Sequence, residues 1–316
     1  MIIELILFVL GIFLLIKGAG LLVNGASSLA KKLGVSTLII GLTIVAFGTS
    51  MPELIVNILA AIRGSGEISF GNVIGSNISN LLLVLGIIAI IYKVKFQNST
   101  RGKEIPFALF SVLILFILSN KTFNGTRIFL LSRTDGLILL FLFGIFIYYA
   151  NKLNKEKPKK VRVSKLSNTK TILFILLGLI GLYFGGKLVV DGAVFIAQSF
   201  GLSEFLISAT IIAIGTSLPE LVVSITAILK KDINLAVGNI IGSNIFNILW
   251  ILGLTAVISP IKIPEFINID LLILAAVTLF LTLIMSTNKK RELKRKHGIL
   301  FILLYLLYLL FLILRG

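Results

Sequence analysis

The sequence contains no cysteine, one histidine and few charged residues. Without cysteine it can form neither disulfides nor thiolate sites, and a single imidazole, at His297, argues against a metal site or catalytic dyad built on histidine. Only 14% of the 316 residues are charged, whereas 57% are hydrophobic. A soluble protein of this length needs far more charge on its surface. These shortages indicate a polytopic membrane protein.

Long apolar segments account for most of the chain. A membrane-spanning helix needs about 20 apolar residues, and the mean hydropathy of +1.09 comes from segments near or above that length. Prolines and glycines within them are compatible with lipid-embedded helices. We therefore predict an all-α membrane protein with ten transmembrane helices, at 2–29, 35–62, 69–92, 104–120, 133–151, 170–198, 204–229, 236–259, 266–286 and 297–314.

Most of the 30 lysines and arginines lie in alternate loops. If the N-terminus is outside the cell, the loops rich in basic residues all face the cytoplasm, in agreement with the positive-inside rule. An even number of spans then places both termini outside a plasma membrane. The net charge of +17 is thus explained by topology and by contact with anionic membrane lipid, and nucleic-acid binding is not expected.

Two motifs occur twice at a constant offset of 167 residues. GTSMPEL begins at Gly48 and GTSLPEL at Gly215, and GNxIGSNIxN follows from Gly71 and from Gly238. Five predicted spans precede the one long basic loop and five follow it, so the second set enters the membrane from the opposite side. We predict two inverted-topology repeats of five helices joined by a cytoplasmic linker, with boundaries at 1–151, 152–169 and 170–316.

Each GTSxPEL motif places a glutamate, Glu53 or Glu220, at membrane depth. A carboxylate there is costly, and no basic residue in the motif neutralises it, so a cation or proton is the expected partner. The proline of each motif lacks an N–H and loosens the helix, which frees backbone carbonyl oxygen. Ala46, Thr49 and Glu53 fall on one helical face. Carboxylate, hydroxyl and carbonyl oxygens are the ligands that calcium prefers.

The second motif adds a polar stripe at a spacing of four residues. Its members are Asn72, Ser76 and Asn80, repeated as Asn239, Ser243 and Asn247. An isolated serine of this kind often bonds its own helix, and an asparagine often joins two helices. Four glycines let a neighbouring helix approach closely: Gly71, Gly75, Gly238 and Gly242. Elsewhere, Asp191 lies four residues after Lys187, which predicts a local ion pair.

These motifs resemble the alpha-repeats of the cation/calcium antiporter superfamily, and specifically those of prokaryotic sodium/calcium exchangers. The resemblance covers most of the chain. It implies an ion site at the membrane midplane between the second, third, seventh and eighth helices, with the first and sixth helices sliding across it. By matching position, it assigns ion ligands to Glu53, Glu220, Thr49, Thr216, Ser50, Ser217, Ser76, Ser243, Asn80 and Asn247, and to the carbonyls of Ala46 and Ala213.

The resemblance implies secondary active transport of Ca²⁺ in exchange for Na⁺. No cofactor apart from the transported ions, and no obligatory protein partner, is expected. Potassium-dependent relatives carry aspartate at the position of Asn247, so potassium co-transport is not expected here. Other divalent cations, including manganese and cadmium, could use the same oxygens.

Four other functions are weighed against this interpretation. Proton/calcium exchange is the main alternative, because two close carboxylates raise each other's proton affinity. An intramembrane hydrolase with Ser50 or Ser217 as nucleophile needs a neighbouring base, and only the glutamates are available. A channel would need the same ligands but would conduct continuously. A structural scaffold gives no reason for two mirrored carboxylates.

Overall fold

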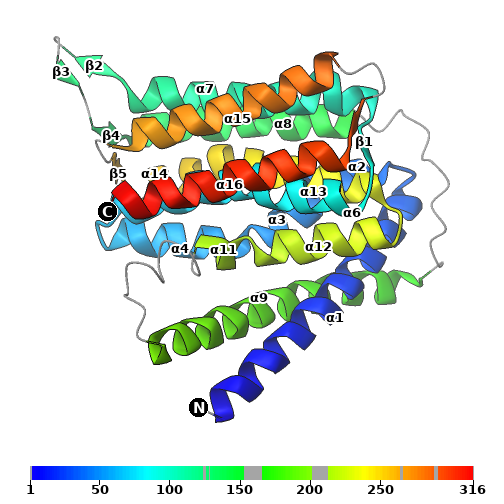
Figure 1. Ribbon diagram of the computed structural model, residues 1–316. Helices are drawn as coiled ribbons and strands as arrows, with labels where there is room; N and C mark the ends of the chain where they lie inside the picture. The colour runs from blue at the N-terminus through cyan, green and yellow to red at the C-terminus, as the bar shows by residue number, and fades with distance from the viewer. Residues whose placement is uncertain are drawn as a thin grey trace.

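The computed structural model describes residues 2–123, 126–127, 129–152, 166–200, 213–263, 266–287 and 291–315. Its helices lie side by side in layers, and both termini are at the same end (Figure 1). Eight described helices are individually long and apolar enough to cross a membrane, and one bent pair makes a ninth. Most of the predicted linker 152–169, and the start of the predicted span 204–229, lie outside the described residues.

The first half contains a long first helix, a broken second span and three further helical spans. The helical segments, in which η marks a π-helical turn, are α1 (Ile2–Leu33), α2 (Thr37–Ile40), η1 (Gly41–Val45), α3 (Ala46–Thr49), α4 (Met51–Ile62), α5 (Gly66–Ser79), η2 (Asn80–Val84), α6 (Leu85–Ile91), η3 (Thr100–Glu104), α7 (Ile105–Ser119) and α8 (Arg133–Lys152). Two-residue strands lie in the connections: β1 (Val94–Lys95), β2 (Thr122–Phe123), β3 (Thr126–Arg127) and β4 (Leu130–Leu131).

The second half repeats this order. It contains α9 (Asn168–Ser199), α11 (Ala213–Thr216), α12 (Leu218–Leu229), α13 (Ile233–Ile245), η6 (Phe246–Leu252), α14 (Gly253–Ile258), β5 (Ile261–Lys262), α15 (Ile267–Thr287), β6 (Glu292–Leu293) and α16 (Arg295–Arg315). Antiparallel pairs β1–β6 and β4–β5 join connections from different halves. The π-helical turns η2 and η6 lie at equivalent places in the two halves, and such turns are frequent at functional sites.

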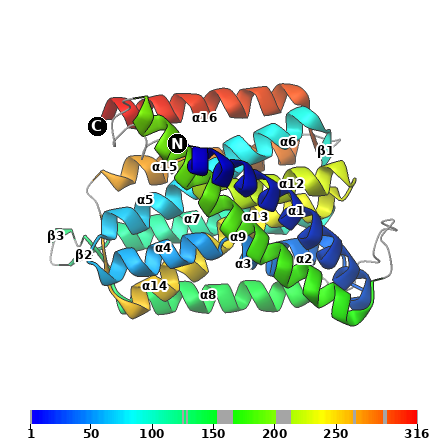
Figure 2. The same ribbon diagram turned by 90° about the horizontal axis from the view of Figure 1, so that it is seen from below.

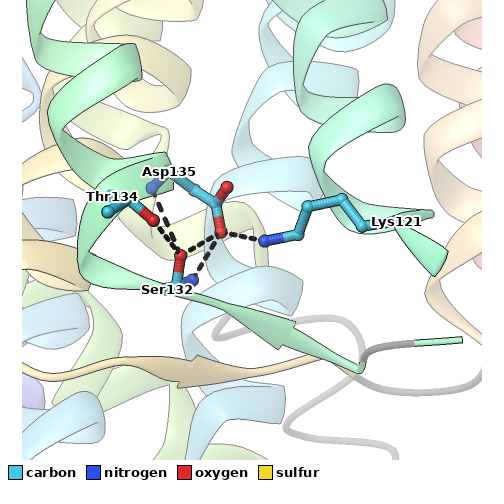
Figure 3. A network of polar contacts seen from close by, with 4 residues as sticks. All are labelled: Lys121, Ser132, Thr134 and Asp135. Atoms are coloured by element: carbon cyan, nitrogen blue, oxygen red, sulfur yellow. Dashed lines mark hydrogen bonds and ion pairs between the residues drawn. The ribbon is translucent and has the colours of Figure 1, made fainter. Parts of the chain in front are cut away.

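Helix α8 ends and helix α9 begins at the same end of the bundle, which we call the linker end. The opposite end is called the far end. At the far end a polar network fixes the start of α8 (Figure 3). Ser132 Oγ accepts a hydrogen bond from Asp135 N at 3.3 Å, and Asp135 Oδ2 accepts from Ser132 N at 2.7 Å. This reciprocal pair is a capping box. Lys121, which follows α7, forms an ion pair with the same carboxylate.

Helices α1 and α9 cross on one side of the bundle and run in opposite directions (Figures 1 and 2). A Cβ atom added to Gly18 would lie 2.9 Å from the carbonyl oxygen of Gly178, and one added to Gly185 would lie 2.9 Å from that of Gly11. The two backbones are therefore in direct contact along a glycine seam, formed by Gly11, Gly18 and Gly25 on α1 and Gly178, Gly185 and Gly192 on α9.

The seam contacts are related by the 167-residue offset. The residue equivalent to Gly18 in the other half is Gly185, and the residue equivalent to Gly178 is Gly11. These two equivalents form the second contact. Contacts that exchange in this way are what a twofold axis relating two repeated segments produces.

Among the eight unbroken spans of the described residues, α5–η2–α6 and α13–η6–α14 are the most enclosed. A Cβ atom on Gly238 would lie 2.4 Å from the carbonyl oxygen of Leu38, and one on Gly242 would lie 2.8 Å from Leu42. The close approach predicted for these two glycines is therefore confirmed. Added Cβ atoms on Gly71 and Gly75 meet no described atom within 4 Å. The positions equivalent to Leu38 and Leu42 in the other half, 205 and 209, lie outside the described residues, so for Gly71 and Gly75 the close approach stays a prediction.

Candidate cation site

The second span is broken immediately before Glu53. Ser50 has φ −86° and ψ 9° between α3 and α4, and the two parts of the span are bent by 46°. Pro52 then occupies the first turn of α4, where its missing N–H costs nothing. Ser217, at φ −85° and ψ 2°, separates α11 from α12 in the same way. Each glutamate thus lies in the first turn of a helix, whose dipole favours a negative charge.

Both glutamate side chains are fully buried, at 0% exposure. Glu53 Oε1 accepts a hydrogen bond from Ser76 Oγ at 3.1 Å. Glu220 Oε1 accepts from Ser50 Oγ at 3.2 Å and lies 3.4 Å from Ser243 Oγ. Ser50 belongs to the first half and Glu220 to the second, so a hydroxyl of one half binds the carboxylate of the other.

The two glutamates belong to one cluster. Ser76 Oγ, which donates to Glu53, lies 3.4 Å from Ser217 Oγ at the break before α12. The structure thus joins the hydrogen bonds of the two glutamates into one cluster, in which serine hydroxyls from both halves contact one another and the carboxylates.

Thr49 contacts the opposite half. Its Oγ1 donates to Asn239 Oδ1 at 3.1 Å and lies 3.4 Å from Ser243 Oγ. The sequence predicts a continuous helical face that Thr49 shares with Glu53. The break at Ser50 interrupts that face, and no hydrogen bond joins Thr49 to Glu53 among the residues that the structure describes.

Asparagines fix the backbone of each glutamate. Asn72 Nδ2 donates to the carbonyl oxygen of Glu53 at 3.4 Å, and its equivalent Asn239 donates to that of Glu220 at 3.4 Å. Asn57 Nδ2 also donates to the Glu53 carbonyl, at 2.7 Å. These amides satisfy main-chain oxygens and leave the carboxylates to other partners.

Asn77 is a residue that the sequence prediction missed. Its Nδ2 donates to the carbonyl oxygen of Asn244 at 3.2 Å, and its Oδ1 accepts from Asn247 Nδ2 at 3.0 Å. Asn247 Nδ2 also lies 3.3 Å from Ser76 Oγ. Asn77 and Asn244 occur in both copies of the second motif, which was a usable signal, but the spacing of four residues passes over them.

Some buried acceptor oxygens of the cluster have no partner among the described atoms. They are Glu53 Oε2, Glu220 Oε2, Asn80 Oδ1 and Asn247 Oδ1, which form two pairs related by the repeat. A buried polar atom left unpaired costs about 1–3 kcal/mol. No cluster of three or more histidine, aspartate or glutamate side chains occurs in the described part. The chemistry suits a hard cation held by two carboxylates and neutral oxygens.

Four other predicted residues make no polar contact with either carboxylate in the part of the chain described. The Ala46 carbonyl accepts from Ser50 N at 3.0 Å within the helix. Ala213 is the first residue of α11. Asn80 is buried, and neither of its side-chain polar atoms has a described partner. Thr216 lines cavities of about 310 and 230 Å³.

These two cavities lie next to the cluster. The larger is also lined by Asn72 and Ser76, and the smaller by Pro52 and Pro219. The smaller cavity also contacts α9, through a set that includes Lys187 and Asp191. The ion pair predicted between Lys187 and Asp191 is not present among the described contacts, so that prediction is wrong.

A family model described as sodium/calcium exchanger protein matches residues 3–151 and 170–314. The sodium/calcium exchanger MaX1 of Methanosarcina acetivorans is 32% identical over 339 aligned positions, covering 96% of each chain. The inner membrane protein YrbG of Escherichia coli is 36% identical over 80% of this chain and 79% of its own. A solved structure of the sodium-calcium exchanger NCX_Mj superposes with a TM-score of 0.83 at 33% identity, covering 97% of both chains.

Proposed function

The chain belongs to the sodium/calcium exchanger protein family, and from that premise we propose that it extrudes Ca²⁺ in exchange for Na⁺. It is a multi-pass membrane transporter and not an enzyme. The observation that carries the proposal is the pair Glu53 and Glu220. Both are completely buried, no described basic side chain pairs with them, and one oxygen of each lacks a described partner.

We assign the ion ligands to the cluster around these glutamates. The carboxylates supply two negative charges, which balance one Ca²⁺ or two Na⁺ ions. Neutral oxygens complete the coordination, from Thr49, Thr216, Ser50, Ser217, Ser76, Ser243, Asn80 and Asn247 and from the carbonyls of Ala46 and Ala213. The contacts of Ser50, Ser76 and Ser243 with the carboxylates support this assignment.

We further propose ten spans in two inverted halves, 1–151 and 170–316, joined by a cytoplasmic linker at 152–169. The ion site then lies at the midplane, between helices 2, 3, 7 and 8. The exchanged contacts in the glycine seam support the inversion. The basic loops support a plasma-membrane protein with both termini outside.

Coupling follows from the cost of an empty site. Two ionised carboxylates without a partner are unfavourable in a low-dielectric interior. The protein is therefore expected to change its open side only when cations occupy the site. Ca²⁺ and Na⁺ compete for the same oxygens, so each must leave before the other binds.

The test is calcium-45 uptake into proteoliposomes loaded with sodium. Wild-type vesicles should take up calcium only when the sodium concentration is higher inside than outside. Glu53→Gln or Glu220→Gln should abolish this uptake. Glu104→Gln is the control, because Glu104 is equally buried but contacts Tyr149 at 2.7 Å, away from the cluster. Uptake that is indifferent to sodium, or that persists in Glu53→Gln, refutes the proposal.

Proton/calcium exchange is the alternative, since carboxylates in one cluster can share a proton. The same vesicles distinguish it. A pH gradient in sodium-free buffer should drive no calcium uptake, and uptake under that condition would make protons the coupling ion.

A further inference from the structure

The turn between α12 and α13 holds α1 at the linker end. Lys230 Nζ donates to the carbonyl oxygen of Gly20 at 3.0 Å and to Asn24 Oδ1 at 2.8 Å. Two residues later, Asp232 accepts a hydrogen bond from Ser27 Oγ at 3.0 Å. Three residues of α1 are thus bound to one turn, and we call these contacts the linker-end clamp.

The turn between α4 and α5, at the far end, has the same backbone conformation. Arg63 has φ −81° and ψ 0°, and its equivalent Lys230 has φ −83° and ψ 6°. The next residue has a positive φ in both turns, +74° at Gly64 and 63° at Lys231. Both turns end on the residue that precedes a helix, Ser65 or Asp232. The two turns are therefore equivalent in structure as well as in sequence.

The offset of 167 residues also identifies the partners of this second turn. Gly20 corresponds to Lys187 and Asn24 to Asp191, both on α9. Arg63 and Asp191 are exposed, and no hydrogen bond or ion pair of either side chain occurs in the described part of the chain. Lys187 and Asp191 line the 230 Å³ cavity that separates α9 from α4 and α12. The counterpart of the linker-end clamp is therefore open.

We propose that Arg63 and Asp191 form an ion pair that closes the far end in the opposite conformation. The inference rests on the proposed function, because it assumes transport by inverted halves that exchange roles when the accessible side changes. Arg63 then occupies the place of Lys230, and Asp191 that of Asn24. Ser65 and Val194 replace Asp232 and Ser27, so the second contact of the clamp has no polar counterpart.

Charge exchange tests the pair in the calcium-45 assay. Arg63→Glu and Asp191→Arg should each slow sodium-driven uptake about fivefold, which corresponds to about 1 kcal/mol for a partly exposed ion pair. The double variant should recover to within about twofold of wild type. Arg133→Glu is the control, since Arg133 is also exposed at the far end but lies on α8. Double-variant uptake no faster than that of the slower single variant overturns the proposal.

Cross-linking tests the pair without relying on transport. Because the sequence has no cysteine, introduced pairs react with a short bifunctional thiol reagent without background. Asn24→Cys with Lys230→Cys should cross-link, as the described conformation requires. Arg63→Cys with Asp191→Cys should also cross-link, and faster than Arg63→Cys with Gln198→Cys, which places the second thiol two turns further along α9. Equal rates for the last two pairs overturn the proposal.

The two experiments separate this inference from the proposed function. If wild-type vesicles show no sodium-driven calcium uptake but the Arg63–Asp191 pair cross-links selectively, the proposed function fails and the far-end pair stands. If wild type transports and the pair does not cross-link selectively, only the far-end pair is refuted.

Discussion

Adding one methyl group to the glycine seam should destabilise the protein, and a second glycine on the same helix provides the control. A Cβ atom on Gly18 would lie 2.9 Å from the Gly178 carbonyl oxygen and 2.9 Å from the Leu182 nitrogen. Both are backbone atoms and cannot rotate away. A Cβ atom on Gly20 meets no atom of the described residues within 4 Å. The two substitutions therefore make the same chemical change in opposite surroundings.

The expected magnitudes have opposite signs. Alanine in place of a helical glycine gains up to about 1 kcal/mol from propensity alone, and Gly20→Ala should keep that gain. Overpacking costs about 1–3 kcal/mol. Because the atoms that Gly18→Ala would meet are backbone atoms, we expect a cost of about 2–3 kcal/mol and thus a net loss of about 1–2 kcal/mol. One kcal/mol corresponds to about 2–4 °C in Tm for a chain of 150–250 residues, so the two variants should differ by several degrees.

The assay is thermal unfolding in detergent, followed by the fluorescence of Trp250 or by the fraction that remains monodisperse. Both variants are compared with wild type at one heating rate, since membrane proteins often unfold irreversibly. A Gly18→Ala protein as stable as Gly20→Ala would show that the α1–α9 contact tolerates a methyl group. The close backbone packing described above would then not be a requirement of the fold.

Two other changes have defined outcomes. Ser132→Ala removes the capping box of α8 and should lower the unfolding free energy by about 1 kcal/mol. The same melting assay checks this, with Thr287→Ala as control, because Thr287 is exposed at the end of α15 and its hydroxyl bonds only its own helix; equal Tm values would contradict the prediction. Asn247→Asp replaces the donor to Ser76 and Asn77 with a third carboxylate, so calcium affinity measured by calorimetry should rise more steeply with pH than in wild type as that group ionises. An unchanged pH dependence would place residue 247 away from the ion.

The sequence predicted the helical spans well because lipid imposes a simple rule. A segment must be about 20 residues long and apolar, and such segments are visible without knowledge of tertiary contacts. Most predicted boundaries differ from those of the described helices by only a few residues. The exceptions concern interruptions within spans, such as the break at Ser50 and the π-helical turns η2 and η6. Hydropathy averages over a span and does not register where its hydrogen bonding changes.

In the candidate site, too, some features could be predicted from the sequence and others could not. Glu53 and Glu220 stand out because a carboxylate in an apolar segment has few explanations. Their contacts were harder to infer, because they depend on how four helices cross. Helical spacing predicts that Thr49 lies beside Glu53, whereas the structure places Thr49 against Asn239 and Ser243. The spacing of four residues passes over Asn77, whose contact with Asn244 in the other half of the chain is visible only in the structure.

The glycine seam has a consequence for leakage. Because α1 and α9 touch backbone to backbone, neither helix can shift far without the other, and we expect the two helices to move together as one unit. A tilt of this helix pair that moves it away from the bundle at one end moves it toward the bundle at the other end. Opening one end should therefore close the other. In an exchanger, a continuous water path would dissipate both gradients. Residues that never contact an ion, such as Gly18 and Gly185, would thus keep the two sides separate.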